Sequence, residues 1–152
     1  MALIHEKLYE LEAFSKIGFS KYTRELVNHI KKSYQDNATN VNVDVNIKDI
    51  FLNIKIAIPC GLILNELLSN SFKYAFKNKT QGNIKIGFTK NVGFYVLSIE
   101  DDGIGIDMSS FENQDNSLGL SLVNALVEQL DGKIELDNKN GTKFVITFAE
   151  LQ

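Results

Sequence analysis

The chain has 152 residues, of which 44% are hydrophobic and 23% are charged, a globular composition sufficient for one well-buried domain. The formal net charge is −3 and Arg24 is the only arginine, so an extended basic surface that binds nucleic acid is not expected. Cys60 is the only cysteine and no run approaches the roughly 20 apolar residues of a membrane span, so neither an internal disulfide nor membrane insertion of this fragment is expected.

Two helices are predicted at the N-terminal end. The first has an apolar seam with spacings of three and four, formed by Met1, Ile4, Leu8 and Leu11. Two heptads do not distinguish the end of a coiled coil from a helix that docks on its own domain. The second helix is expected to begin with Ser20 as its cap. Its apolar face carries Tyr22, Leu26, Ile30 and Tyr34.

The central part of the chain predicts a strand followed by a long helix. Residues 41–47 read VNVDVNI, and this alternation indicates a strand with its valines and Ile47 on one face. Pro59 suits the first turn of a helix, which is expected to continue to about Phe76.

The C-terminal half predicts two hairpins with a helix between them. Apolar alternation indicates the first strand, an almost wholly apolar run indicates the second, and a turn at NKNG indicates the last two. Apolar residues at helical spacing indicate the helix between the hairpins. The strands span 84–88, 94–99, 133–137 and 143–148, and the helix spans 122–130. The order of the elements predicts an α+β fold, a two-layer sandwich with helices on one face of a mixed, mainly antiparallel sheet.

A polar stripe runs along the predicted central helix. Glu66, Asn70 and Lys73 are separated by four and three residues, which places them on one side of an α-helix. Leu64, Leu68, Ser71 and Ala75 form another stripe, which is small and apolar. A carboxamide oxygen can bind a hard ion such as Mg²⁺, an ammonium group can neutralise phosphate, and a carboxylate can accept a proton. Taken alone, the polar stripe is more simply interpreted as an ordinary solvent-exposed face.

Three further segments carry glycine together with polar groups. DDGIG, residues 101–105, follows an apolar strand, so a carboxylate lies beside main chain that a flat ligand can approach closely. SLGLSLV, residues 117–123, begins a helix, where free N–H groups favour a phosphate. NGTKF, residues 140–144, is most simply a hairpin turn. Each segment alone also fits a purely structural turn or an ordinary helix start.

Together and in this order, these segments resemble the ATP-binding domain of sensor histidine kinases, within the ATPase superfamily shared with gyrase, Hsp90 and MutL. NELLSNSFKYAF resembles the N box, DDGIG and SLGLSLV resemble the two glycine boxes, and NGTKF resembles the terminal GTxF element. The resemblance implies a Bergerat-type ATP-binding fold. MALIHEKLYE also resembles the end of the second dimerisation helix in the subfamily with an HHxVKNN acceptor motif.

For the central helix, the resemblance implies contacts with Mg-ATP. Asn70 would hold Mg²⁺ and Lys73 would reach the phosphates. Tyr74 would pack by the adenine or ribose. Glu66 occupies the position of the proposed general base, which in the kinases would orient or deprotonate the acceptor histidine.

For the loops, the resemblance implies contacts with the nucleotide. Asp101 would accept a hydrogen bond from the adenine amine, and Gly103 and Gly105 would let the main chain pass close to the base. Gly119 would border the phosphates. Thr142 would support the adenine end of the site.

The chain departs from the family pattern in three places. Ser117 replaces the first glycine of the second glycine box, and residues 106–116 form a short lid in which Phe111 is the only aromatic residue. Neither His5 nor His29 has the sequence context of a phosphoacceptor. The acceptor is therefore expected outside this chain.

The resemblance implies two regions: residues 1–14 as the end of the dimerisation and phosphoacceptor helices, and residues 15–152 as the ATPase domain. The leading hypothesis is the cytoplasmic catalytic part of a two-component sensor histidine kinase. It would transfer the γ-phosphoryl group of ATP to a histidine on an upstream dimerisation helix, from which a response regulator receiver domain would take it. The full-length protein would be a homodimer.

Two alternatives stay open. An anti-sigma-factor-type serine kinase shares the nucleotide-binding fold, but such a domain does not need the N-terminal helix with its apolar seam. A degenerate nucleotide-sensing or dimerisation module is consistent with Ser117 and the short lid. It is less consistent with the intact set of Glu66, Asn70, Lys73 and Asp101.

Overall fold

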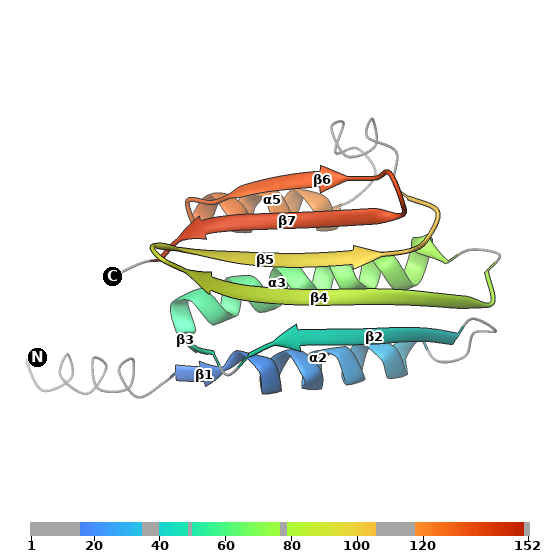
Figure 1. Cartoon of the computed structure of the whole chain (residues 1–152), viewed down its shortest axis with the longest axis horizontal. Coiled ribbons are helices and arrows are strands. Elements are labelled where there is room, and N and C mark those ends of the chain that lie inside the picture. Colours follow the sequence, from blue (N-terminus) through green and yellow to red (C-terminus); the bar gives the residue numbers. More distant parts are fainter. Residues whose placement is uncertain (1–15, 35–39, 49, 77–78, 106–117, 151–152) are drawn as a thin grey trace, which may run out of the picture.

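The computed structural model describes residues 16–34, 40–48, 50–76, 79–105 and 118–150. Their main feature is a five-stranded sheet with helices on one face (Figure 1). The strands are β2 (Asn40–Ile47), β4 (Gln81–Asn91), β5 (Phe94–Asp101), β6 (Lys133–Asp137) and β7 (Thr142–Ala149). The helices are α2 (Phe19–Ser33), α3 (Ile54–Asn70) with its π-helical extension η1 (Ser71–Ala75), and α5 (Leu118–Gln129).

The order of strands in the sheet is β2-β4-β5-β7-β6. β2 pairs with β4 in parallel, and the other neighbours are antiparallel. In Figure 1, α5 lies behind β6 and β7, α3 behind β5 and β4, and α2 along β2. The predicted α+β sandwich with a mixed, mainly antiparallel sheet is therefore confirmed, while the predicted helix at residues 1–14 lies outside the described residues.

Strand alternation sorts the side chains as expected. In β2, Val41, Val45 and Ile47 are buried against the helices and the residues between them are exposed or half-buried. The turn between β4 and β5 contains Gly93, whose φ of 85° favours glycine, and Gly141 plays the same part before β7 with a φ of 95°. Both predicted hairpins are present.

The predicted beginnings of two helices are wrong. α2 begins at Phe19 with Gly18 as the N-cap, so Ser20 already lies inside the helix. Asn53 caps α3 by accepting a hydrogen bond from the Lys55 N–H at 2.9 Å, so Pro59 lies beyond the first turn. Proline has no N–H, so the helical hydrogen bond from residue 59 to the Lys55 carbonyl is absent.

Two short strands were not predicted. β1 (Lys16–Gly18) and β3 (Phe51–Asn53) pair antiparallel as a separate two-stranded sheet beside the start of α3. Three residues are too few to display a period of two, so no sequence pattern marks them. Their pairing fixes the entry points of α2 and α3.

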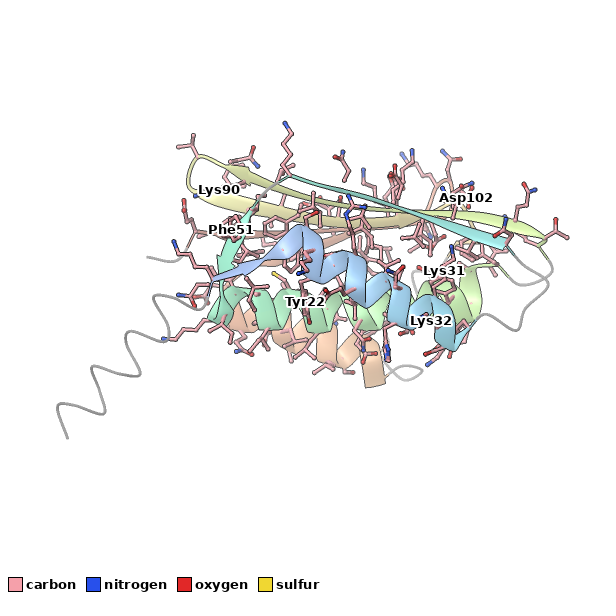
Figure 2. All side chains as sticks on the ribbon, turned by 90° about the horizontal axis from the view of Figure 1, so that it is seen from below. Tyr22, Lys31, Lys32, Phe51, Lys90 and Asp102 are labelled. Atoms are coloured by element: carbon pink, nitrogen blue, oxygen red, sulfur yellow. The ribbon has the colours of Figure 1, made fainter. Side chains whose placement is uncertain are left out.

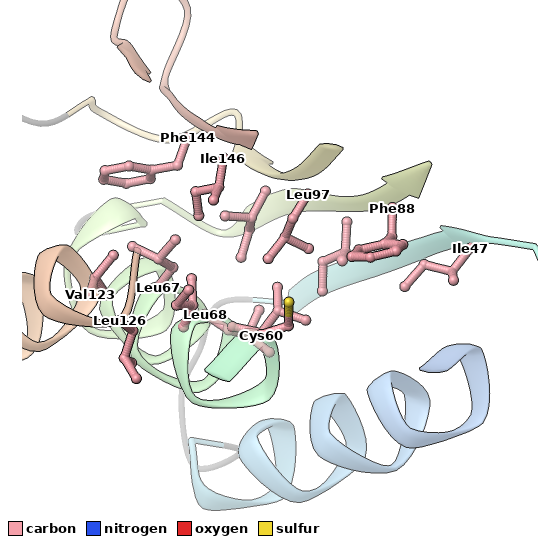
Figure 3. Close-up of a cluster of buried hydrophobic side chains, with 14 of the residues drawn as sticks. Ile47, Cys60, Leu67, Leu68, Phe88, Leu97, Val123, Leu126, Phe144 and Ile146 are labelled. Atoms are coloured by element: carbon pink, nitrogen blue, oxygen red, sulfur yellow. The ribbon is translucent and has the colours of Figure 1, made fainter. Parts of the chain in front are cut away.

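The core lies between the sheet and α3 (Figure 3). Cys60, Leu67 and Leu68 of α3 are fully buried or nearly so, beneath apolar side chains from all the long strands of the sheet. The side chains that meet them there include Ile47, Phe88, Leu97, Phe144 and Ile146, with Val123 and Leu126 from α5. α3 is thus the central core helix. Its C-terminal end lies at the C-terminal end of β5, where Ser71 bonds to Asp101.

None of the helices in the described part of the chain has the length and apolar character needed to cross a membrane.

Candidate functional site

The polar residues at the end of α3 lie on its accessible side. Glu66 and Asn70 are half-buried and Lys73 is exposed, whereas the small-residue stripe of Leu64, Leu68, Ser71 and Ala75 is buried. The predicted separation into a polar and an apolar side is therefore observed. Helical structure continues to Ala75, close to the predicted end at about Phe76, but its last five residues form the π-helix η1.

After Asn70 the chain makes a π-helical turn, η1. The Ser71 N–H donates to the carbonyl oxygens of both Leu67 and Leu68, which marks the point where the hydrogen-bond ladder changes. A π-helix has more residues per turn, so the α-helical spacing that aligned Lys73 with Asn70 no longer applies. Single π-turns occur frequently at functional sites.

Asp101, the last residue of β5, is the most strongly fixed polar group of the predicted site. Its side chain is buried, with 7% of its surface exposed. Oδ1 accepts hydrogen bonds from the Gly103 N–H at 3.0 Å and the Thr142 N–H at 3.3 Å, and Oδ2 accepts one from the Ser71 hydroxyl at 3.0 Å. These donors come from the loop after β5, from β7 and from η1, so three segments meet at one carboxylate.

Burial raises the pKa of Asp101, and the hydrogen bonds from Gly103, Ser71 and Thr142 offset only part of this effect. The negative charge of Asp102 adds to the rise. The carboxylate is therefore costly to keep ionised. Such a cost is common at functional sites, because a buried acceptor that is not fully paired gains most from a ligand that donates to it.

Two glycines shape the loop beside this carboxylate. Gly103 lies against the main chain of Ala75, and the neighbouring Ile104 N–H donates to the Ala75 carbonyl at 2.9 Å. Gly105 has a φ of 84°, and a Cβ atom there would lie 3.3 Å from the carbonyl oxygen of Gly141. The loop is therefore held close to η1 and to the β6–β7 turn.

The second aspartate of DDGIG has a different role. Asp102 is exposed, and its two carboxylate oxygens accept from the main-chain N–H and the side-chain amide of Asn83 at 2.7 and 2.9 Å. Partial desolvation would raise the pKa of Asp102, but these hydrogen bonds outweigh it and hold that pKa below its ordinary value. Asp102 ties the loop to the start of β4.

The remaining predicted residues make no hydrogen bond to Asp101 in the described part of the chain. Tyr74 on η1 is 55% exposed, and Gly119 is the second residue of α5. In the described residues, no hydrogen bond joins Glu66, Asn70 or Gly119 to the Asp101 carboxylate. Ser117, Phe111 and the predicted lid lie outside the described residues.

The end of α2 lies at the same end of the molecule. The rings of Tyr34, which follows α2, and Phe72 on η1 are stacked with centroids 5.7 Å apart. Figure 2 shows Lys31 and Lys32 at the end near Asp102, opposite Phe51 and Lys90. Two lysines in the last turn of α2 add positive charge there, which favours an anionic ligand.

Ser71 was not predicted as a site residue. It was assigned to the small apolar stripe, and its hydroxyl group is the only polar side-chain group on that stripe. This single hydroxyl group on an otherwise apolar stripe is the sequence feature that could have indicated a role for Ser71. Its partner Asp101 is 30 residues away, so the contact depends on the fold.

The polar groups around Asp101 and at the end of α3 are chemically suited to an adenine nucleotide with a metal ion. A fixed carboxylate and nearby glycine main chain suit a flat base with an exocyclic amine. In the described part of the chain, no group of three or more His, Cys, Asp or Glu side chains could hold a metal on its own. The carboxamide of Asn70 could supply one oxygen to Mg²⁺, whose usual coordination completes with phosphate oxygens and water.

Comparisons with known proteins give a consistent result. Residues 55–152 match the family model described as "Histidine kinase-, DNA gyrase B-, and HSP90-like ATPase", and residues 1–34 match one described as "Histidine kinase". The chain is 25% identical over 121 residues to "Blue-light-activated histidine kinase 2" of Erythrobacter litoralis, covering 79% of this chain. It covers 33% of that relative, about a third of its length.

Solved structures show the same fold. The histidine kinase domain of the Erythrobacter litoralis EL346 blue-light-activated histidine kinase superposes with a TM-score of 0.78 at 23% identity, covering 88% of this chain and 61% of that one. The mycobacterial sensor histidine kinase MprB superposes with a TM-score of 0.62 at 19% identity, covering 84% of this chain and 93% of that one. The resemblance to the ATP-binding domain of sensor histidine kinases is confirmed by the family match.

Proposed function

The chain belongs to the family of histidine kinase-, DNA gyrase B- and HSP90-like ATPases, and from this premise we propose that it is the catalytic, Mg-ATP-binding part of a sensor histidine kinase. The observation that carries the proposal is the buried Asp101 carboxylate, held by Ser71, Gly103 and Thr142. Oδ1 already accepts two hydrogen bonds and Oδ2 accepts one. Since each carboxylate oxygen can accept two, Oδ2 has one remaining acceptor position for the exocyclic amine of adenine.

The phosphate end of the nucleotide would lie along the accessible side of α3 and η1. Asn70 would offer its carboxamide oxygen to Mg²⁺, and Lys73 and the N-terminal end of α5 at Gly119 would contact phosphate oxygens. Mg²⁺, when bound, would neutralise charge on the phosphates. Tyr74 would pack beside the adenine or ribose, and Gly103 and Gly105 would let the loop approach the base.

Glu66 would act on the acceptor histidine. In the transfer, a nitrogen of the imidazole ring attacks the γ-phosphorus, the bond to the β–γ bridging oxygen breaks, and ADP leaves. Glu66, half-buried one turn before Asn70, would orient the ring or accept its proton. Positioning and charge stabilisation are the main requirements of phosphoryl transfer, and this small set of residues can supply them.

The acceptor histidine would belong to a dimerisation helix of the longer protein, of the HHxVKNN subfamily, and residues 1–14 would form the end of that helical region. The match of residues 1–34 to a histidine kinase family model supports this. The full-length protein would be a homodimer. Its catalytic part would lie in the cytoplasm, whether the whole protein is soluble or attached to a membrane. A response regulator receiver domain would then take the phosphoryl group.

The first experiment measures binding of a fluorescent ATP analogue to the chain with and without Mg²⁺. We expect Mg²⁺-dependent binding that Asn70→Asp weakens at least 10-fold, because an added negative charge alters the metal contact and repels phosphate. Asn91→Asp, at the end of β4, is the matched control and should bind normally. The absence of Mg²⁺-dependent binding at millimolar nucleotide, together with no effect of Asn70→Asp, would refute the proposal.

The second experiment tests the transfer itself. Radiolabelled ATP is incubated with the chain and the dimerisation helices of the longer protein. Acid-labile phosphate on the helices is the expected result, since phosphohistidine hydrolyses in acid. Acid-stable phosphate on a protein partner would instead favour the serine-kinase alternative, and binding without any transfer would favour a nucleotide-sensing module.

A further inference from the structure

The hydrogen bonds to Asp101 are unevenly distributed between its two oxygens. Oδ1 accepts two main-chain N–H groups, from Gly103 and Thr142, whereas Oδ2 accepts the Ser71 hydroxyl at 3.0 Å. Two N–H donors occupy the usual capacity of Oδ1. The oxygen that remains available to a ligand is therefore the one that Ser71 holds.

The geometry of Ser71 leaves its hydroxyl little freedom. Its side chain is buried, with 8% of its surface exposed, and its main-chain N–H is occupied by the carbonyls of Leu67 and Leu68. An ionised carboxylate cannot donate, so the single hydroxyl hydrogen of Ser71 must point at Oδ2. The contact therefore favours the ionised form of Asp101 and restricts its rotation.

Few charges act on this pair. On its own strand end, Asp102 is the titratable neighbour, and its negative charge disfavours ionisation of Asp101. The residues that face Asp101 from η1, the loop, β4 and β7 are the uncharged Ser71, Gly103, Ile84 and Thr142. No cation of the described residues bonds to the carboxylate. Among the described residues, the carboxylate therefore accepts hydrogen bonds from neutral donors, and Ser71 is the only one of these that supplies a side-chain group.

We propose that Ser71 is a positioning residue, which directs Oδ2 of Asp101 at the exocyclic amine of the nucleotide base and so sets the affinity for adenine nucleotides. The inference rests on the proposed nucleotide site. It adds to that site a residue that touches Asp101 and acts through it. The main-chain donors of Gly103 and Thr142 could be removed only by proline, which would also change the backbone, so Ser71 is the position at which this control can be altered by itself.

The test compares Ser71→Ala with Ser69→Ala, a half-buried serine two residues earlier on the same helix end. Two quantities are measured for each: the pKa of Asp101 in the nucleotide-free protein, followed by its carboxyl ¹³C resonance, and the pH dependence of the Kd for ATP. Ser71→Ala should raise the pKa of Asp101 further and weaken ATP binding about 10-fold near neutral pH, since a hydrogen bond to a charged group is lost. The acid limit of binding should move to higher pH.

Ser69→Ala should leave both quantities unchanged. The proposal is overturned if Ser71→Ala leaves the pKa of Asp101 where it is in the unmodified protein, even if the protein becomes less stable or binds less ATP, since a purely structural role would have that effect. If the unmodified protein binds no ATP, the proposed function fails, while the pKa measurement still decides whether Ser71 controls Asp101.

Discussion

Gly103 lies so close to the main-chain carbonyl of Ala75 that a methyl group on Gly103 would overlap its oxygen. The next residue donates its N–H to this same carbonyl, so the loop after β5 and the end of η1 are held together by main-chain atoms. Main chain cannot rotate away as a side chain can. The contact therefore links the Asp101 loop rigidly to the turn that carries Ser71.

Gly103→Ala should consequently both destabilise the protein and weaken nucleotide binding. Overpacking of this kind costs about 1–3 kcal/mol, because the loop must move away from η1. The free energy of unfolding in urea and the Kd for ATP measure the two effects.

Gly93→Ala is the control for the Gly103 variant. Gly93 has a φ of 85° but open space around it, so alanine there incurs only the backbone cost of about 1–2 kcal/mol and should leave ATP binding unchanged. Equal ATP affinity for the two variants would mean that the tight contact at Gly103 does not shape the site.

Asp101→Asn should separate stability from binding. The raised pKa of Asp101 means that the folded state binds its proton more tightly than the unfolded chain does. Stability therefore falls as the pH rises from the unfolded-state pKa, near 3.8, through the folded-state pKa, and the full cost is present above the latter. Asparagine is neutral and can still accept the two N–H groups.

We therefore expect Asp101→Asn to be at least as stable as the unmodified protein at neutral pH, with an advantage that shrinks on acidification, while ATP binding is lost. Thermal denaturation between pH 3 and pH 8 measures the first effect, and a nucleotide titration measures the second. The prediction is contradicted if the stability of Asp101→Asn relative to the unmodified protein decreases as the pH rises.

The part of the fold that follows from side-chain periodicity could be predicted from the sequence. β2 buries the face that its alternation indicates, and β4, β5 and β7 alternate between buried and more exposed residues. The glycines at 93 and 141 lie in the turns of the two hairpins. The features that were missed have no periodic signal. β1 and β3 are too short, and the π-turn of η1 depends on how the chain packs against the loop after β5.

The candidate site divides in the same way. Asp101 and the loop glycines could be predicted, because a carboxylate and flexible main chain follow directly after an apolar strand. Ser71 could not, because its role is defined by a partner 30 residues away, and its own neighbours on the stripe are apolar. The roles of all the predicted site residues toward a nucleotide stay predictions: Glu66, Asn70, Lys73, Tyr74, Asp101, Gly103, Gly105, Gly119 and Thr142.

Asp102→Asn should lower stability for a reason opposite to that of Asp101→Asn. The folded-state pKa of Asp102 is lowered, so its stabilising effect is present above the unfolded-state pKa near 3.8 and disappears as the pH falls through the folded-state value. In the variant, an amide would face the side-chain amide of Asn83. A modest decrease in Tm at neutral pH is expected, which narrows on acidification.

Asp44→Asn, at an exposed position on β2, is the control for Asp102→Asn and should change Tm less. If Asp102→Asn has the same Tm as the unmodified protein at all pH values, the contact with Asn83 does not hold the loop in solution.

The rate at which a thiol reagent labels Cys60 measures how often the folded protein opens, and this measurement needs no substitution. It is fully buried, and burial raises the pKa of its thiol to about 12, so the native protein should react very slowly with a thiol reagent. If labelling requires unfolding, ATP at 100 times its Kd should slow it about 100-fold, because the ligand stabilises the folded state. Labelling in urea, where the thiol is accessible, is the positive control, and fast labelling of the native protein would contradict the burial of Cys60.

The most direct test of the central claim, that the Asp101 site binds an adenine nucleotide, is an amide NMR titration of the chain with Mg-ADP. The largest changes are expected at Ser71, Gly103, Gly105 and Thr142, with smaller ones along the end of α3. Asp101→Asn should abolish them while the rest of the spectrum stays folded. A spectrum that does not respond to millimolar Mg-ADP, or one whose changes lie on the open face of the sheet, would contradict the account.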